Sequence, residues 1–171
     1  MNYLTKASPH NLTLALYQPD IPQNTGTILR ACACLGFDAA IIGPTGFPST
    51  DRDFRRAGMD YLNQIHLERH ISYAAFIDYL RLEAPGQRRK RLILLSTKAE
   101  SAYTDCAYQA GDILLVGRES AGVPDEVFAD CERAVKIPMR PPARSLNVAV
   151  AAAIVMSEAL RQLSLNDRPT P

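Results

Sequence analysis

The chain has 171 residues, of which 47% are hydrophobic, and a formal net charge of +1. This length and composition fit one globular domain with a sizeable core. No run approaches the roughly 20 apolar residues of a membrane helix, and the N-terminus lacks the apolar core of a secretory signal. We therefore expect a cytoplasmic protein with no membrane contact. The small net charge gives no overall indication of a nucleic-acid partner.

The cysteines and histidines exclude the usual disulfide and metal frameworks. There are four cysteines, none of them in a C-x-x-C pair, and three histidines. Disulfides are rare in the cytosol, and too few ligands remain for a metal site. We expect free thiols and no metal, with Cys32 and Cys34 as small packing residues in or beside the first helix.

Apolar runs alternate with helical patterns along the chain. Strands are predicted at residues 12–17, 37–42, 65–67, 92–95, 112–116 and 134–137. Helices are predicted at residues 24–35, 54–57, 72–83, 125–129 and 146–162. The alternation predicts an α/β fold with a mainly parallel sheet and helices on both faces. Residues 1–163 are expected to form one domain, and residues 164–171 a polar tail.

Local signals set several helix boundaries. Asn24 or Thr25 is predicted to cap the first helix, and Gly36 suits the position just after its end. Ser72 is predicted to cap the helix at 72–83, and Pro124 suits the first turn of the next helix.

The last helix, 146–162, is rich in alanine and apolar on nearly all sides. A helix with this composition is buried on all sides. Two arrangements would bury it, either a second subunit covering one side or a place inside the monomer.

Polar loops follow several of the predicted strands, at residues 96–98, 117–124 and 138–145. Ligands of parallel sheets bind beyond the carboxyl ends of the strands, and helix starts offer free N–H groups. Together with residues 24–30, these loops predict one composite site. The chain has neither a G-x-G-x-x-G fingerprint nor a P-loop, which disfavours dinucleotide and NTPase sites.

Arginines cluster beside these loops. Arg52, Arg55 and Arg56 lie in one segment, and Arg140 and Arg144 flank the proline-rich loop. Their position next to candidate site loops favours a functional role. The basic run at 88–91 is instead expected to be solvated surface charge.

Five segments carry a family resemblance, in matching order and spacing. They are residues 21–30, 55–61, 117–124, 137–147 and 158–162. With these motifs the chain resembles the SPOUT class of S-adenosylmethionine-dependent RNA methyltransferases over residues 12–163. It is most similar to small bacterial enzymes that methylate the ribose 2′-oxygen of the tRNA wobble nucleotide, cytidine or uridine at position 34.

The resemblance implies a C-terminal trefoil knot and a homodimer with its sites near the subunit interface. It implies S-adenosylmethionine as methyl donor, S-adenosylhomocysteine as product, no metal, and the tRNA anticodon loop as partner. By motif match the donor is held by the backbone around Leu95, Gly117, Ile137 and Ser145. Its methyl group would face the partner subunit's first motif.

The catalytic candidates also come from the motif match. Arg30 would polarise or orient the ribose hydroxyl, because a pKa above about 12 makes arginine a poor base. Asn24 would fix the ribose or Arg30, and Glu119 would hold a loop or pair with Arg30. Ser145 and Asn147 would organise the donor pocket.

The arginine clusters would contact RNA phosphates, in a role that is sensitive to salt. The residues are Arg52, Arg55, Arg56, Arg140 and Arg144.

Two departures from the wobble group leave the RNA target open. That group usually has Leu-Ser-Asn where this chain has Val148, Ala149 and Val150, and often has proline at Arg118. Another tRNA site or an rRNA site is therefore an alternative target. A non-catalytic RNA-binding module and a flavodoxin-like nucleotide binder are the alternatives from other classes.

Overall fold

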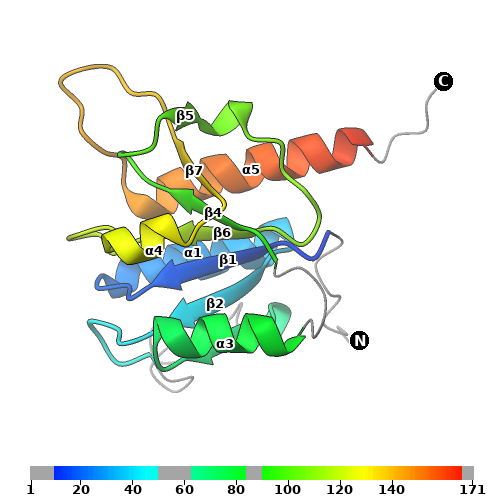
Figure 1. Ribbon diagram of the computed structural model, residues 1–171, viewed down its shortest axis with the longest axis vertical. Helices are drawn as coiled ribbons and strands as arrows, with labels where there is room; N and C mark the ends of the chain where they lie inside the picture. The colour runs from blue at the N-terminus through cyan, green and yellow to red at the C-terminus, as the bar shows by residue number, and fades with distance from the viewer. Residues whose placement is uncertain (1–9, 50–62, 84–89, 167–171) are drawn as a thin grey trace.

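The computed structural model describes residues 10–49, 63–83 and 90–166 (Figure 1). Within these ranges seven strands form one sheet, in the order β3-β2-β1-β6-β4-β7-β5. The strands are β1 Thr13–Tyr17, β2 Asp38–Ile42, β3 Leu67–His70, β4 Leu92–Leu95, β5 Ser101–Ala102, β6 Ile113–Val116 and β7 Arg133–Lys136. Every neighbouring pair is parallel, which confirms the predicted parallel sheet.

Helices cover both faces of this sheet, as predicted. They are α1 Pro22–Leu35, α3 Tyr73–Glu83, α4 Asp125–Ala129 and α5 Val148–Asn166, with the 3-10 turn η2 at Tyr103–Asp105. In Figure 1, α1 and α5 lie on one side of the sheet and α3 and α4 on the other. No helix in the described part of the chain is long and apolar enough to cross a membrane.

Alternation along the strands divides the core into two layers. Leu14 and Leu16 of β1 pack with α1 and α5, whereas Ala15 and Tyr17 face α3 and α4. Successive side chains of a strand point to opposite faces, so a strand covered on both faces is apolar throughout. This explains why the central strands are continuous apolar runs.

The first helix begins earlier than predicted. It starts at Pro22, and Ile21 is its N-cap residue without a side-chain cap, so the predicted capping by Asn24 or Thr25 is wrong. Proline suits the first turn because its missing N–H has no helical partner there. The end is as predicted, with Gly36 at φ 73°. Ser72 caps α3 as predicted, since its hydroxyl accepts from the Ala75 amide at 3.1 Å.

Two weak strand signals gave errors. The strand predicted at 65–67 lies at Leu67–His70, pairing with β2 at the edge of the sheet. An edge strand tolerates charged residues, so the sequence of β3 lacks the apolar run that marks a central strand. The two-residue strand β5 was not predicted, because it has no apolar run at all. The helix predicted near 54–57 lies outside the described residues.

Two predictions about single side chains need correction. Cys32 is buried as predicted, and burial raises the pKa of its thiol to about 12, but Cys34 is exposed. Arg91 of the basic run is not simply solvated. Its guanidinium binds both carboxylate oxygens of the buried Asp112, at 2.8 and 2.6 Å.

Helix α5 is buried on one face only. Its buried residues pack on the sheet and on α1, and they are Ala149, Ala152, Val155, Met156, Ala159 and Leu163. Val150, on the other side, keeps 49% of its surface exposed. The prediction of a helix buried on all sides is therefore not met within one copy of the chain.

Candidate functional site

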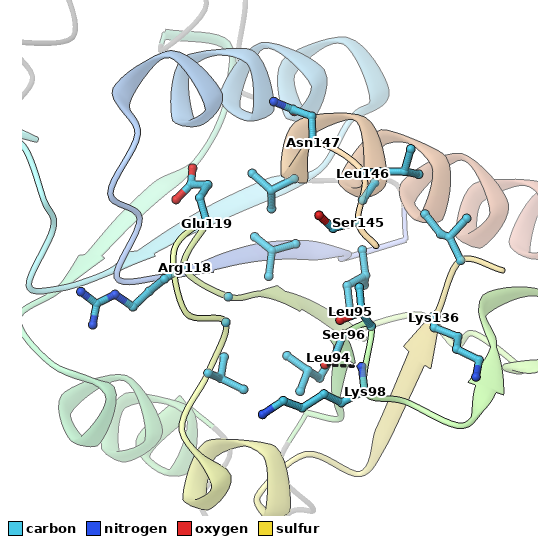
Figure 2. Close-up of a pocket in the computed structure, with 18 of the residues that line it drawn as sticks. Leu94, Leu95, Ser96, Lys98, Arg118, Glu119, Lys136, Ser145, Leu146 and Asn147 are labelled. Carbon is cyan, nitrogen blue, oxygen red and sulfur yellow. Dashed lines mark hydrogen bonds between the residues drawn. The ribbon is translucent and has the colours of Figure 1, made fainter. Parts of the chain in front are cut away.

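A cavity of about 510 Å³ lies beyond the carboxyl ends of β4, β6 and β7 (Figure 2). These strands are neighbours in the sheet, so the loops that follow them meet. The walls are residues 94–98, 116–119, 121–123, 135–137, 139 and 145–148, with Ile21, Asn24, Phe128 and Ala151. The volume is that of a pocket for a medium-sized organic ligand. The predicted convergence of the loops is therefore confirmed.

The lining of the cavity combines apolar and charged residues. Leucines and branched residues form the apolar part, namely Leu94, Leu95, Val116, Val135, Ile137 and Leu146. Lys98, Arg118, Glu119 and Lys136 are the charged lining residues. An apolar slot with a few polar groups suits a flat aromatic ring carrying polar substituents.

A tight hairpin forms the wall that follows β6. The Arg118 amide donates to the Gly122 carbonyl at 3.0 Å, and the Gly122 amide donates back at 2.8 Å. A β-carbon on Gly117 would lie 2.6 Å from the carbonyl carbon of Gly122, so only glycine fits there. Gly122 has φ 66°, a conformation that also favours glycine. We call residues 117–122 the hairpin.

A chain of side-chain hydrogen bonds joins this hairpin to α1 and α5. Asn24 donates from Nδ2 to Glu119 Oε1 at 3.2 Å, and Asn147 donates from Nδ2 to Asn24 Oδ1 at 2.9 Å. The side-chain oxygen of Asn147, Oδ1, accepts a hydrogen bond from the Ala149 amide at 2.8 Å, so Asn147 caps α5. A carboxylate at one end and backbone donors at the other fix the orientation of both amides.

Asp20 holds the hairpin from a third direction. Its Oδ1 accepts from the Glu119 amide at 3.1 Å, its Oδ2 accepts from the Ser120 hydroxyl, and its own amide donates to Glu119 Oε2 at 3.1 Å. The contact with the Glu119 side chain, followed by those with Ser120 and the backbone, lowers the pKa of Asp20 to about 2. Asp20 is therefore an anion at neutral pH.

The structure brings most of the predicted site residues together. The four residues assigned to the donor all line the cavity, and they are Leu95, Gly117, Ile137 and Ser145. Asn24, Glu119 and Asn147 line it as well. Of the two roles predicted for Glu119, the described bonds show the holding of loops.

Three of the predicted arginines, Arg30, Arg140 and Arg144, are not among the described residues that line the cavity. Arg30 is exposed on α1 and is not among the described residues that line the cavity of its own protomer. Arg140 and Arg144 are exposed in the loop between β7 and α5, which projects from the sheet in Figure 1. Arg52, Arg55 and Arg56 lie outside the described residues.

Sequence reasoning missed several residues around the cavity. Lys98 and Lys136 line it. Lys98 lies in the predicted site loop 96–98 but was not singled out, and Lys136 is the last residue of β7. Ser120 lies in the predicted site loop 117–124, but Asp20 carried no signal, because its pairing with Ser120 joins positions 100 residues apart. In the described ranges no set of three His, Cys, Asp or Glu side chains is arranged to hold a metal ion.

Two curated relatives that cover most of this chain carry the name of a tRNA methyltransferase. The tRNA (cytidine(34)-2′-O)-methyltransferase of Beijerinckia indica is 63% identical over 150 residues, 88% of this chain and 91% of that protein. The protein of the same name from Escherichia coli K12 is 40% identical over 154 residues, 89% of this chain and 94% of that protein.

Solved structures agree. One described as giving insight into 2-OH methylation of C/U34 on tRNA has a TM-score of 0.80 and 42% identity, and covers 91% of this chain and 92% of that one. The SpoU methyltransferase AviRb of Streptomyces viridochromogenes, in complex with AdoMet, has a TM-score of 0.79 and 25% identity. That match covers 90% of this chain and 60% of the other.

Sheet, cavity and relatives together define an α/β methyltransferase whose C-terminal part forms a trefoil knot, as expected from the motifs. The family model matches residues 11–157, and the chain belongs to the SpoU rRNA Methylase family. The relatives also answer the question raised by Val148, Ala149 and Val150. Those departures do not separate this chain from the cytidine-34 enzymes, to which it is 63% and 40% identical.

Proposed function

We propose that this protein transfers the methyl group of S-adenosylmethionine to the ribose 2′-oxygen of nucleotide 34, the wobble position, in the anticodon loop of tRNA. The observation that carries the proposal is the 510 Å³ cavity, whose walls contain all four residues matched to the donor site, in a chain 63% identical to an enzyme of that name. A tRNA substrate agrees with the cytoplasmic location expected from the sequence.

The cavity suits this donor in size and chemistry. Leu95 and Ile137 offer apolar surface for an adenine ring, and their backbone groups offer polar contacts to its edge. Gly117 lines the cavity with its backbone, and its lack of a side chain lets it pack closely against Gly122. Ser145 adds a hydroxyl at the start of the α5 wall. When bound, the donor supplies a methyl group already activated by a sulfonium.

The chain's own task is then to orient the ribose hydroxyl and to let its proton leave. A guanidinium is a hydrogen-bond donor without an acceptor, so Arg30 stabilises the developing oxyanion and positions a neighbouring phosphate rather than accepting the proton. Glu119 is engaged by Asn24 and by the Asp20 amide, which makes it an organiser of the site. Its engagement leaves solvent or a phosphate oxygen to take the proton.

We propose that the active form is a homodimer, because Arg30 and the donor cavity of one protomer do not meet. A second hollow of about 590 Å³ runs along the uncovered side of α5, lined by apolar Val150, Ala153 and Ile154 and by Thr27 of α1. Uncovered apolar surface of this kind marks a subunit contact. A second copy seated there would bring its α1, and with it Arg30, toward the neighbouring cavity.

The tRNA would be held by arginine side chains. Arg140 and Arg144 are exposed on the loop between β7 and α5. Arg52, Arg55 and Arg56 lie outside the described residues and stay candidates from the sequence alone. Phosphate contacts of this kind weaken as salt rises.

The test is methylation of bulk tRNA with labelled donor, followed by mapping of the methyl group by nuclease digestion and mass spectrometry. A 2′-O-methyl group at nucleotide 34 is the expected product. Methyl groups at another position, or on rRNA alone, would reject the assignment to the wobble nucleotide. Absence of ribose methylation on any RNA would reject the activity itself.

The role of Arg30 is tested by Arg30→Ala, with Arg81→Ala as the matched control. Arg81 is also an exposed helical arginine, paired with Asp78 at 3.1 Å and remote from the cavity. We expect kcat to fall about a hundredfold in Arg30→Ala, on the scale of one lost transition-state contact. Affinity for S-adenosylhomocysteine should be unchanged in both variants. An Arg30→Ala enzyme as active as Arg81→Ala would remove Arg30 from the mechanism.

A further inference from the structure

The segment that follows β1 is held in place by the loop after β2. Gln18 has a positive φ of 44°, and its amide donates to the Ile42 carbonyl at 2.7 Å. The Gly46 amide donates to the Pro19 carbonyl at 2.9 Å. A β-carbon on Gly46 would lie 2.9 Å from Asp20 Cα, so the two loops touch backbone to backbone. The contacts with the loop after β2 therefore hold the backbone of Asp20 in place.

The Asp20 side chain binds two consecutive residues at the tip of the hairpin. One carboxylate oxygen accepts from the Glu119 amide and the other from the Ser120 hydroxyl. The Asp20 amide returns a bond to the Glu119 carboxylate. The three bonds join the segment after β1 to the hairpin after β6. These two strands are neighbours in the sheet, at the point where the strand order reverses along the chain.

The hairpin is internally braced, because it is closed by its own pair of backbone bonds and by the close approach of Gly117 to Gly122. The hydrogen bonds that Asp20 makes to the tip of the hairpin therefore also position the base of the hairpin. The base includes Gly117, Gly122 and Val123, which line the cavity. Glu119 at the tip also accepts a hydrogen bond from Asn24, and Asn24 in turn accepts one from Asn147.

We infer that Asp20 is a positioning residue for methyl transfer, which fixes the donor wall and the Glu119–Asn24–Asn147 chain without touching donor or RNA. The inference rests on the proposed function. Asp20 itself is not among the described residues that line the cavity. Its carboxylate is ionised at neutral pH, so both of its oxygens can accept hydrogen bonds from the hairpin.

Two substitutions separate the grip from the charge. Asp20→Ala removes both acceptors and releases the hairpin tip. Asp20→Asn keeps an oxygen for the Glu119 amide and offers its NH₂ group to the Ser120 hydroxyl, which also accepts. Asp130→Ala is the control, because Asp130 likewise accepts a hydroxyl bond, from Tyr73 at 2.8 Å, contacts no residue of the hairpin through that bond, and is not among the described residues that line the cavity.

The experiment measures three quantities for these variants. They are hydrogen exchange at the Glu119 amide in the donor-free protein, calorimetric affinity for S-adenosylhomocysteine, and kcat with the KM for S-adenosylmethionine on tRNA. Asp20→Ala should speed exchange and weaken donor affinity about tenfold, the scale of losing hydrogen bonds to a charged acceptor. Asp20→Asn should restore both to within about threefold. Asp130→Ala should change melting temperature alone.

The outcomes are distinguishable. Unchanged exchange and unchanged affinity in Asp20→Ala would overturn the inference, as would an equal loss of affinity in Asp130→Ala. A wild-type protein that binds no S-adenosylhomocysteine would overturn the proposed function instead, while the exchange measurement would still decide whether Asp20 holds the hairpin.

Discussion

Asn147 donates a hydrogen bond to Asn24 across 2.9 Å, although the two residues are 123 positions apart. The same Asn147 side chain accepts from the Ala149 amide and so begins α5. One residue therefore ties the start of the last helix to the first helix, at the edge of the donor cavity. Helix capping and site assembly are two uses of a single amide group.

These two uses can be separated at Asn147. Asn147→Asp keeps the cap, since aspartate caps helices as well as asparagine, but it has no N–H to offer Asn24. Asn147→Ala loses both contacts and about 1 kcal/mol of stability. We expect weaker affinity for S-adenosylhomocysteine in both variants, and a lower free energy of unfolding in Asn147→Ala.

Ser72→Ala is the matched control, because Ser72 caps α3 away from the cavity. It should lose about the same 1 kcal/mol while binding donor normally. Urea titration and calorimetry give the two quantities. Normal donor affinity in Asn147→Asp would show that the Asn24 contact does not organise the site.

Gly117 should not tolerate even one methyl group. In Gly117→Ala the β-carbon would lie 2.6 Å from Gly122 and would force the hairpin apart. Donor affinity should fall at least about tenfold, because the cavity wall moves. Gly111→Ala is the control, with open space around it but φ 85°, so it should lose about 1 kcal/mol of stability and keep donor affinity. Equal donor affinity in the two variants would refute the close-packed wall.

A charge on the uncovered side of α5 should separate the proposed subunits. Val150 is 49% exposed in one protomer and lines the second hollow. Val150→Asp would bury an unpaired carboxylate in the dimer, so sedimentation should show monomers. Leu82→Asp, at a position 77% exposed on α3, should leave the association state unchanged. A dimeric Val150→Asp protein would place the subunit contact elsewhere.

The Asp20 carboxylate should stabilise the protein in a predictable pH range. Its folded pKa of about 2 is below the ordinary value of 3.8, so its contribution is present above the ordinary value and is lost as pH falls toward 2. The difference in unfolding free energy between wild type and Asp20→Asn should be constant from about pH 5 to 8 and shrink below about pH 4. A difference that grows on acidification would contradict the assignment.

The parallel sheet could be predicted from the sequence because its central strands are buried on both faces. Runs such as 92–95 and 113–116 therefore stand out without any knowledge of partners. The edge strand β3 was predicted two residues too early, because Glu68, Arg69 and His70 give it no apolar pattern. The start of α1 was missed for a related reason, since Asn24 looks like a cap but its side chain serves Glu119.

The site was predictable where it follows from strand ends or from motif resemblance. Leu95, Gly117 and Ile137 fall at the ends of apolar strands, and the sheet brings them together. The Asp20 grip was not predictable, because it depends on which two loops meet at the reversal of strand order. The knot likewise followed from resemblance alone, since general rules of chain topology disfavour threading.

Mixing two impaired variants, at a donor concentration too low to saturate Gly117→Ala, tests most directly whether the site is shared between subunits. Arg30→Ala has an intact cavity, and Gly117→Ala has an intact Arg30. Refolded together in equal amounts, they should recover about a quarter of wild-type methylation, because half of the dimers are mixed and each mixed dimer has one complete site. Recovery of no activity, with mixed dimers present, would show that Arg30 serves the cavity of its own protomer and would contradict the shared site.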